Sequence, residues 1–134
     1  MALYQIMYIS TAARPISADE CRGIAYASAA NNRRQDVTGL LLFNSRRFLQ
    51  VLEGPEPSVN AIFDRITADP RHRAVVRLRQ GSVANREFGE WAMAFDDPGH
   101  SSATLSEKVA LLLDKAGPST RAHFIGSAEM HRAH

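Results

Sequence analysis

The chain has 134 residues, of which 45% are hydrophobic and 22% charged, and its formal net charge is +2. These values are typical of one globular domain and argue against a general nucleic-acid-binding role. The N-terminus has no basic leader, and no apolar run approaches the roughly 20 residues of a membrane span, so we expect a cytoplasmic protein that does not bind membranes. The single cysteine, Cys21, excludes an intrachain disulfide and a multi-cysteine zinc site.

The first predicted elements are a strand and a helix. Residues 3–10 are rich in strand-forming residues, and alternate side chains on this strand face opposite sides of the sheet. Ser17 and Glu20 form a capping box, which predicts a helix from this point to about residue 30. The polar run 31–34 is expected to end that helix.

A β-hairpin is predicted over residues 36–55. Two apolar runs, 38–43 and 48–52, flank the turn-like segment 44–47, and their apolar character on both faces is typical of strands that are covered on both sides. Gln50 lies in the middle of the second run, and burying an amide without partners costs about 1–3 kcal/mol. Gln50 therefore either has buried polar partners or faces a polar group that the sequence does not show.

The second half of the chain adds two helices and two strands. Apolar residues at i, i+3, i+4 and i+7 predict a helix over 58–68, which is followed by a strand over 74–83 and a short fifth strand over 91–95. The capping box that begins at Thr104 opens the last helix, and Gly117-Pro118 closes it. This order predicts an α+β fold with a ferredoxin-like βαββαβ(β) sheet, two helices on one face and a C-terminal helix on the other.

A series of short motifs runs along residues 2–97. They are Y-I-S with Tyr8, Asn31-Asn32, D-V-T-G-L-L-L-F, F-L-Q-V-L-E-G-P with Gln50, D-P-R-H with His72, and W-A-M with Trp91 and Met93. Their order and spacing resemble those of the BLUF family of blue-light sensors that use flavin adenine dinucleotide (FAD). The resemblance implies a flavin-binding photosensor domain at residues 1–97 and a C-terminal helical extension at 98–134 that packs on the sheet.

Two polar residues on the central strands are candidates for photochemistry. Taken alone, Tyr8 could be a core tyrosine with a satisfied hydroxyl, and Gln50 a structural amide. A neutral phenol is also oxidisable, and an amide can reverse its hydrogen bonds without creating charge. The resemblance implies that Tyr8 gives an electron and a proton to the excited flavin through Gln50, whose hydrogen bonds then change. Trp91 and Met93, otherwise edge-strand core residues, would flank Gln50 and report its state to the surface.

The resemblance also implies residues that bind the cofactor together with Gln50. Without the resemblance, Asn31 and Asn32 would be helix-terminating residues, and Ile24 and Ile66 would be core residues. The charged residues from 65 to 72 would be a solvated cluster at a helix end. The family pattern has asparagine bind the polar edge of the flavin ring, the isoleucines sandwich the ring, and the charged residues contact its edge or side chain. FAD is the expected cofactor, with FMN or riboflavin as alternatives. The set is Ile24, Asn31, Asn32, Arg65, Ile66, Asp69 and His72.

No motif points to catalysis. The chain lacks a glycine-rich phosphate loop, a nucleophile elbow and H-E-x-x-H, and its five histidines lie singly, so we expect neither an enzyme nor a metal site. The tripeptide at residues 48–50 also occurs in LOV photosensors. Those proteins need a reactive cysteine just ahead of it, which segment 44–47 lacks, so no thiol–flavin adduct is expected.

The expected function is therefore that of a blue-light photoreceptor. We expect it to signal to a separate effector protein through the strand at 91–95 and the helix after Thr104, and to form a homo-oligomer. A light-insensitive ferredoxin-like interaction module is the alternative, and a small hydrolase is a third, weaker one.

Overall fold

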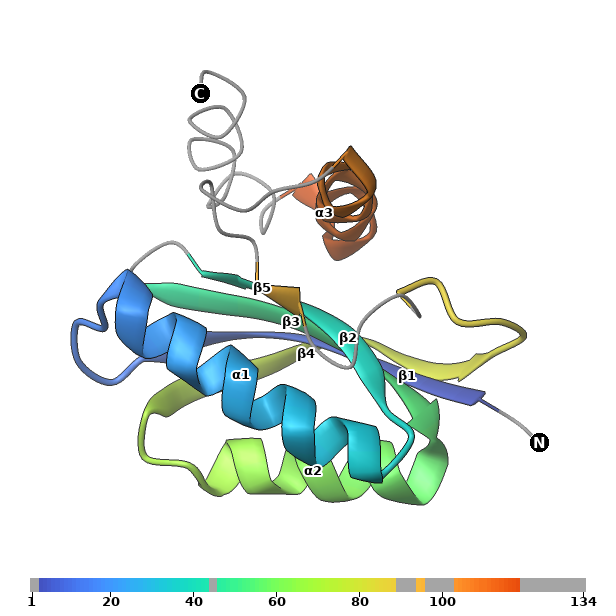
Figure 1. The fold of residues 1–134 in the computed structure, drawn as a ribbon, viewed down its shortest axis with the longest axis horizontal. Helices are drawn as coiled ribbons and strands as arrows, with labels where there is room; N and C mark the ends of the chain where they lie inside the picture. Colours follow the sequence, from blue (N-terminus) through green and yellow to red (C-terminus); the bar gives the residue numbers. More distant parts are fainter. Residues whose placement is uncertain (1–2, 44–45, 89–93, 96–102, 119–134) are drawn as a thin grey trace.

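The computed structural model describes residues 3–43, 46–88, 94–95 and 103–118, and Figure 1 shows the fold. A five-stranded sheet with the order β4-β1-β3-β2-β5 lies between two layers of helices. Helices α1 (Ala18–Arg34) and α2 (Glu56–Ala68) cover one face, and α3 (Ala103–Ala116) lies on the other. The predicted α+β, ferredoxin-like fold is confirmed.

The two central strands have neighbours on both sides. Strand β1 (Leu3–Ala12) pairs antiparallel with β3 (Arg47–Pro55) and with β4 (His72–Val83). Strand β2 (Thr38–Phe43) pairs antiparallel with β3 and parallel with β5 (Ala94–Phe95). Because β1 and β3 are covered on both faces, they carry apolar side chains on both faces.

Alternation along β1 divides the core into two clusters. Tyr8 belongs to the cluster under α1 and α2, whereas its neighbour Met7 belongs to the cluster under α3, where Val109 and Leu112 are buried. The predicted division into residues 1–97 and 98–134 stays a prediction. Among the described residues, no helix is long and apolar enough to cross a membrane.

Several boundaries differ from those predicted. The Ser17 cap is confirmed, since its Oγ accepts from the Glu20 N–H at 3.1 Å, but α1 continues through the polar run 31–34. The backbone carbonyl of Asn32 in this last turn accepts the N–H of Gln35 at 3.0 Å and that of Val37 at 2.9 Å, so local capping bonds close the helix where side-chain polarity alone suggested a loop. Of the predicted strand 91–95, only β5 falls within the described residues, and Trp91 and Met93 lie outside them.

The C-terminal helix ends at the predicted position. Gly117 has φ of 96°, the left-handed conformation that suits glycine after a helix. At its other end α3 begins at Ala103, so Thr104 is a helical residue rather than the cap that the pattern predicted. Shifts of one or two residues at helix ends are common.

A buried carboxylate joins four parts of the fold. Glu53 on β3 is 0% exposed and accepts from Gln5 Nε2 on β1 at 2.9 Å and from the backbone N–H groups of Glu87 and Phe88 at 2.9 and 2.6 Å. The Glu87 carboxylate in turn pairs with Lys115 Nζ of α3 at 2.9 Å. These contacts attach the segment after β4, and through it α3, to the central strands.

Candidate functional site

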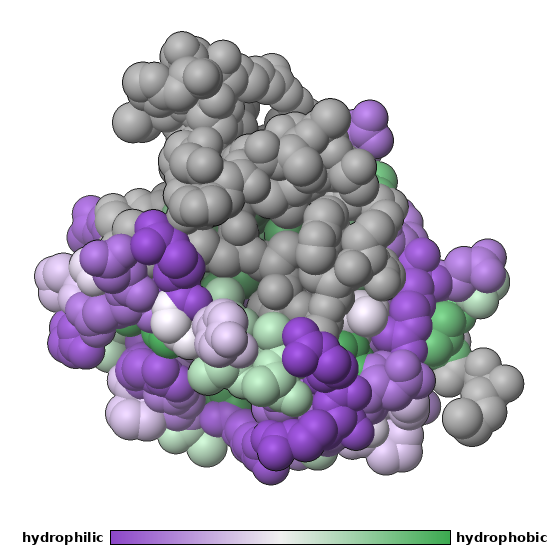
Figure 2. Space-filling view, in the orientation of Figure 1, coloured by the Kyte–Doolittle hydropathy of each residue, from purple (hydrophilic) through white to green (hydrophobic). Residues whose placement is uncertain are grey.

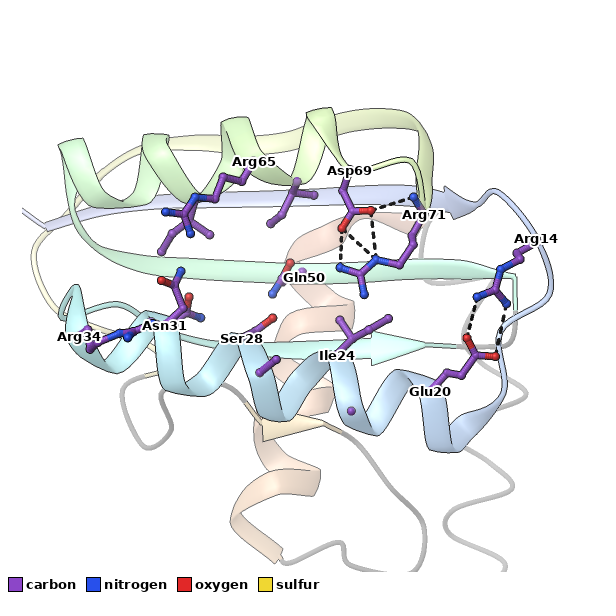
Figure 3. Close-up of a pocket in the computed structure, with 15 residues that line it drawn as sticks. Arg14, Glu20, Ile24, Ser28, Asn31, Arg34, Gln50, Arg65, Asp69 and Arg71 are labelled. Atoms are coloured by element: carbon purple, nitrogen blue, oxygen red, sulfur yellow. Dashed lines mark hydrogen bonds and ion pairs between the residues drawn. The ribbon is translucent and has the colours of Figure 1, made fainter.

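A cleft of about 640 Å³ lies between α1 and α2, with Gln50 of β3 in its floor. Its size falls within the range of pockets that hold small organic molecules. Figure 3 shows the two helices as facing walls, with Ile24, Ser28 and Asn31 on α1 and Arg65 on α2. The residues that line it are Arg14, Glu20, Gly23, Ile24, Ala27, Ser28, Asn31, Asn32, Arg34, Gln50, Ile62, Arg65, Ile66, Asp69 and Arg71.

Tyr8 and Gln50 are hydrogen-bonded beneath this cleft. The register of β1 and β3 places them directly opposite one another, and the Tyr8 hydroxyl donates to Gln50 Oε1. Both side chains are buried, at 1% and 5% exposure. Of the two alternatives left open for Gln50, the structure shows the buried polar partner. In Figure 3 the amide oxygen points toward α2 and the amide nitrogen toward α1, so the donor end of the amide lies on the α1 side.

The surroundings of Tyr8 favour the neutral phenol. The Phe63 ring meets it edge-on with ring centroids 5.4 Å apart. Burial raises the pKa of Tyr8 far above its ordinary range, and the negative charge of Asp69 adds to this. The proton of Tyr8 therefore stays on the phenol at neutral pH unless the ring loses an electron.

The walls and edges of the cleft fit a flat heteroaromatic ring. Ile24 and Ile66, on facing helices, supply apolar surface, and Asn32 supplies a buried amide at 1% exposure. Asn31 is half-buried and accepts from Gln35 Nε2 at 3.3 Å, so part of its hydrogen-bonding capacity is used within α1. An amide offers both a donor and an acceptor, which matches the N–H and carbonyl groups on the polar edge of a flavin.

Charged residues mark both ends of the cleft. At one end Arg71 Nε contacts both carboxylate oxygens of Asp69, at 3.1 and 3.0 Å, and this pairing lowers the pKa of Asp69. Arg14 and Glu20 form a further ion pair of 2.9 Å near this end, and Arg65 lies toward the other. The sequence left open whether the charged residues around the end of α2 are a solvated cluster or cofactor contacts. Arg65, Asp69 and Arg71 line the cleft, and one residue of the group does not.

The exception is His72, which is not among the lining residues. Its Nδ1 lies 2.7 Å from Ser10 Oγ, and its ring lies 4.6 Å from the Phe48 ring. The cause is the start of β4 at residue 72, two residues earlier than predicted, which pairs His72 with Ala12 of β1. A flavin contact of His72 stays a prediction.

His72 is expected to make the stability of the fold depend on pH. Burial lowers the pKa of His72 from 6.5, with Asp69 opposing this shift and Arg71 adding to it. The unfolded chain therefore binds the proton more readily, so the contribution of His72 to the free energy of unfolding is expected to be largest above pH 6.5 and to fall as the pH drops through the lowered pKa. Urea unfolding between pH 8 and 5.5 should show this loss in the wild type and a weaker loss in His72→Gln. If the unfolding free energy changes with pH equally in both proteins, groups other than His72 cause the change. Asp69 is not such a group, because its lowered pKa lies below this pH range.

Some lining residues were missed from sequence. Arg14 and Glu20 come from a loop and a first helical turn, where no periodicity marks them. Ser28 shares a helical face with Ile24 and Asn31, and that four-residue spacing could have added it to the candidate set.

The buried Cys21 does not line the cleft, and burial raises the pKa of its thiol to about 12, which disfavours thiolate chemistry. Among the described residues, no group of three potential ligands could hold a metal ion.

Comparisons with known sequences agree with the motifs. The BLUF family, described as sensors of blue-light using FAD, matches residues 3–94. The alpha subunit of photoactivated adenylate cyclase from Euglena gracilis is 34% identical over 93 residues. The match covers 68% of this chain but only 9% of the cyclase subunit, so it concerns one small part of that protein.

Solved structures agree as well. The dark-state structure of BlrB, a BLUF protein, has a TM-score of 0.69 at 28% identity and covers 98% of this chain and 93% of BlrB. Klebsiella pneumoniae BlrP1 with FMN and cyclic diGMP has a TM-score of 0.67 at 32% identity, covering 80% of this chain and 29% of BlrP1. The family match spans most of the chain and contains both Tyr8 and Gln50. The chain belongs to the BLUF family.

Proposed function

We propose that this protein senses blue light through a flavin in the α1–α2 cleft, with the Tyr8–Gln50 hydrogen bond as its switch. The observation that carries the proposal is the buried hydrogen bond from the Tyr8 hydroxyl to an amide in the floor of that cleft. Gln50 would hold one edge of the ring from β3, Asn32 another from α1, and the isoleucines its faces. The role is sensory, with no net chemical conversion.

A bound flavin supplies the absorption of blue light and an excited state that accepts an electron. Tyr8 would supply that electron, and its hydroxyl proton would pass toward the ring through Gln50, whose Oε1 it already contacts. Return of the electron and proton would restore the neutral Tyr8. Gln50 would be left rotated or tautomerised, so that the end of its amide that faces Tyr8 changes from acceptor to donor.

FAD is the proposed cofactor. The family description names FAD, whereas one BlrP1 structure was solved with FMN, so FMN stays the alternative. Both contain the ring that the isoleucines and amides of this cleft fit, and both carry phosphate that the arginines at the ends of the cleft favour. Extraction of the cofactor and chromatographic comparison with FAD, FMN and riboflavin identifies it directly.

We place the output of the sensor in α3. The carboxylate network of Glu53 joins β3, which carries Gln50, to Glu87 and Phe88, and Lys115 of α3 pairs with Glu87. A change at Gln50 can therefore alter how α3 packs on the sheet. Trp91 and Met93 follow this segment in sequence and are proposed to take part. The receiver is proposed to be a separate effector protein, and the sensor a homo-oligomer.

Asn32→Ala is expected to weaken flavin binding by about tenfold or more, because it removes a buried amide from the cleft and leaves a polar edge of the ring unpaired. Flavin fluorescence quenching, titrated with protein that has been stripped of cofactor, gives the dissociation constant. Asn60→Ala, a half-buried asparagine on α2 that does not line the cleft, is the matched control. Equal affinities in Asn32→Ala and the wild type would remove Asn32 from the site.

A further inference from the structure

The outward face of α1 carries an exposed aromatic residue. Tyr26 is 83% exposed, and Val76 on β4 is the other large hydrophobic residue that stands out as exposed in the described part of the chain, at 52%. Tyr26 lies midway along α1 and points away from the core residues Cys21 and Ala25. Figure 2 shows pale, near-neutral surface over the middle of this helix, with strongly hydrophilic surface toward its ends.

The exposed residues around Tyr26 follow a coiled-coil spacing. Positions 19, 23, 26, 30 and 33 alternate steps of four and three residues, so their side chains form one stripe along the helix. All five are exposed. Gly23 and Ala30 flank Tyr26 and are small enough to let a second helix approach closely.

Charge along this stripe is self-complementary in the antiparallel direction. Asp19 lies seven residues before Tyr26, and Arg33 lies seven residues after it. When two copies of α1 are laid antiparallel with their Tyr26 residues at the crossing point, Asp19 of each copy meets the partner's Arg33. A parallel arrangement would instead set like charges against each other at both ends.

We propose that two copies of this chain associate through antiparallel α1 helices, around a two-fold axis that passes near Tyr26. Each Tyr26 ring lies over the small residues beside the partner's Tyr26, and the two ends are joined by Asp19–Arg33 pairs. The same surface serves both copies, as a closed dimer requires. Asp19 contacts Arg22 of its own helix at 2.8 Å, but an ion pair between such exposed groups contributes little and can be exchanged.

One helix pair buries less surface than a standard interface, so the dimer is weak and depends on concentration. It does not depend on the proposed light response, since Asp19, Tyr26 and Arg33 do not line the cleft, and of the stripe only Gly23 lies at its edge. The oligomeric state in the dark, with cofactor as purified, tests the proposal by itself.

Sedimentation velocity of the full chain between about 10 µM and about 1 mM should show a monomer–dimer equilibrium. Tyr26→Glu places two carboxylates at the axis and should raise the dimer dissociation constant by at least about tenfold. Val76→Glu makes the same change at the other exposed hydrophobic residue and should leave this constant within about twofold. A monomer throughout, or a dimer that Tyr26→Glu leaves unchanged, overturns the proposal.

Charge reversal tests the antiparallel orientation. Asp19→Arg and Arg33→Asp each create two like-charge contacts in a symmetric dimer, and each should weaken it by about threefold to tenfold. The double variant restores opposite charges and should recover the wild-type constant within about twofold. Thermal unfolding of each variant shows that it is folded at the temperature of the measurement. Single variants that weaken the dimer without recovery in the double variant would exclude the proposed pairing.

Discussion

Replacing Gln50 by leucine is expected to abolish the light-induced red shift of the flavin while the protein stays folded and coloured. Leucine approximates the volume of glutamine but offers no hydrogen bond to exchange. Tyr8→Phe should also abolish the red shift, because it removes the proton and the readily oxidised phenol while keeping the ring that packs edge-on against Phe63. Loss of its electron transfer should increase flavin fluorescence. Light-minus-dark absorption spectra and fluorescence yields measure both effects.

A double-mutant cycle of unfolding free energies, with Gln50→Leu, Tyr8→Phe and the double variant, separates the contribution of the hydrogen bond from that of packing. Gln50→Leu leaves the buried Tyr8 hydroxyl without its acceptor, which should cost about 1–3 kcal/mol of unfolding free energy. Removing both partners is expected to cost less than removing the glutamine alone, since no buried polar group is then left unpaired. All three variants should lack the red shift. An intact red shift in either single variant would remove that residue from the switch.

The second large effect is expected at Glu53, on the opposite face of the sheet. Glu53→Ala should lower the free energy of unfolding by about 3–5 kcal/mol, because it removes the acceptor of two backbone N–H groups and the shorter of the two hydrogen bonds of Gln5 Nε2, which keeps only the 3.1 Å bond to Glu87 Oε1. Glu53→Gln is the matched control. It keeps the size and one acceptor oxygen, and should cost less.

Urea unfolding of the three proteins under one set of conditions measures the difference. The structure also predicts that Lys115→Ala costs far less than Glu53→Ala, since the Lys115–Glu87 pair is partly exposed, at 23% and 29% of each side chain. A loss below about 1 kcal/mol in Glu53→Ala would show that the segment after β4 is held by other contacts.

The sequence predicted most of the fold because its signals were local. The capping box at Ser17, the hairpin at 38–52 and the closing Gly117 depend on a few neighbouring residues each, and all three were observed. The predicted order of strands then brought β1 beside β3. Their register, which makes Tyr8 and Gln50 direct neighbours, depends on long-range pairing, and sequence pattern alone left open whether they share a contact.

The errors arose where side-chain polarity misleads or long-range pairing decides the structure. The polar run 31–34 suggested a loop, yet it forms the last turn of α1, with Asn32 buried at 1% exposure. His72 was grouped with its neighbours in sequence, but the early start of β4 turns it toward Ser10. The sequence pattern does not mark Glu53, since a glutamate after an apolar run is typical of the exposed end of a strand. Only the fold shows that backbone N–H groups from residues 87 and 88 converge on it.

The most direct test of a light-switched hydrogen bond at Gln50 is the absorption spectrum of the purified full chain, recorded in the dark, under blue light and again in the dark. The spectrum should show the bands of oxidised flavin, a small shift to longer wavelength on illumination, and full return afterwards. Such a shift without bleaching indicates changed hydrogen bonds around an intact ring. Bands that bleach, bands that do not respond to light, or a colourless protein would contradict the account.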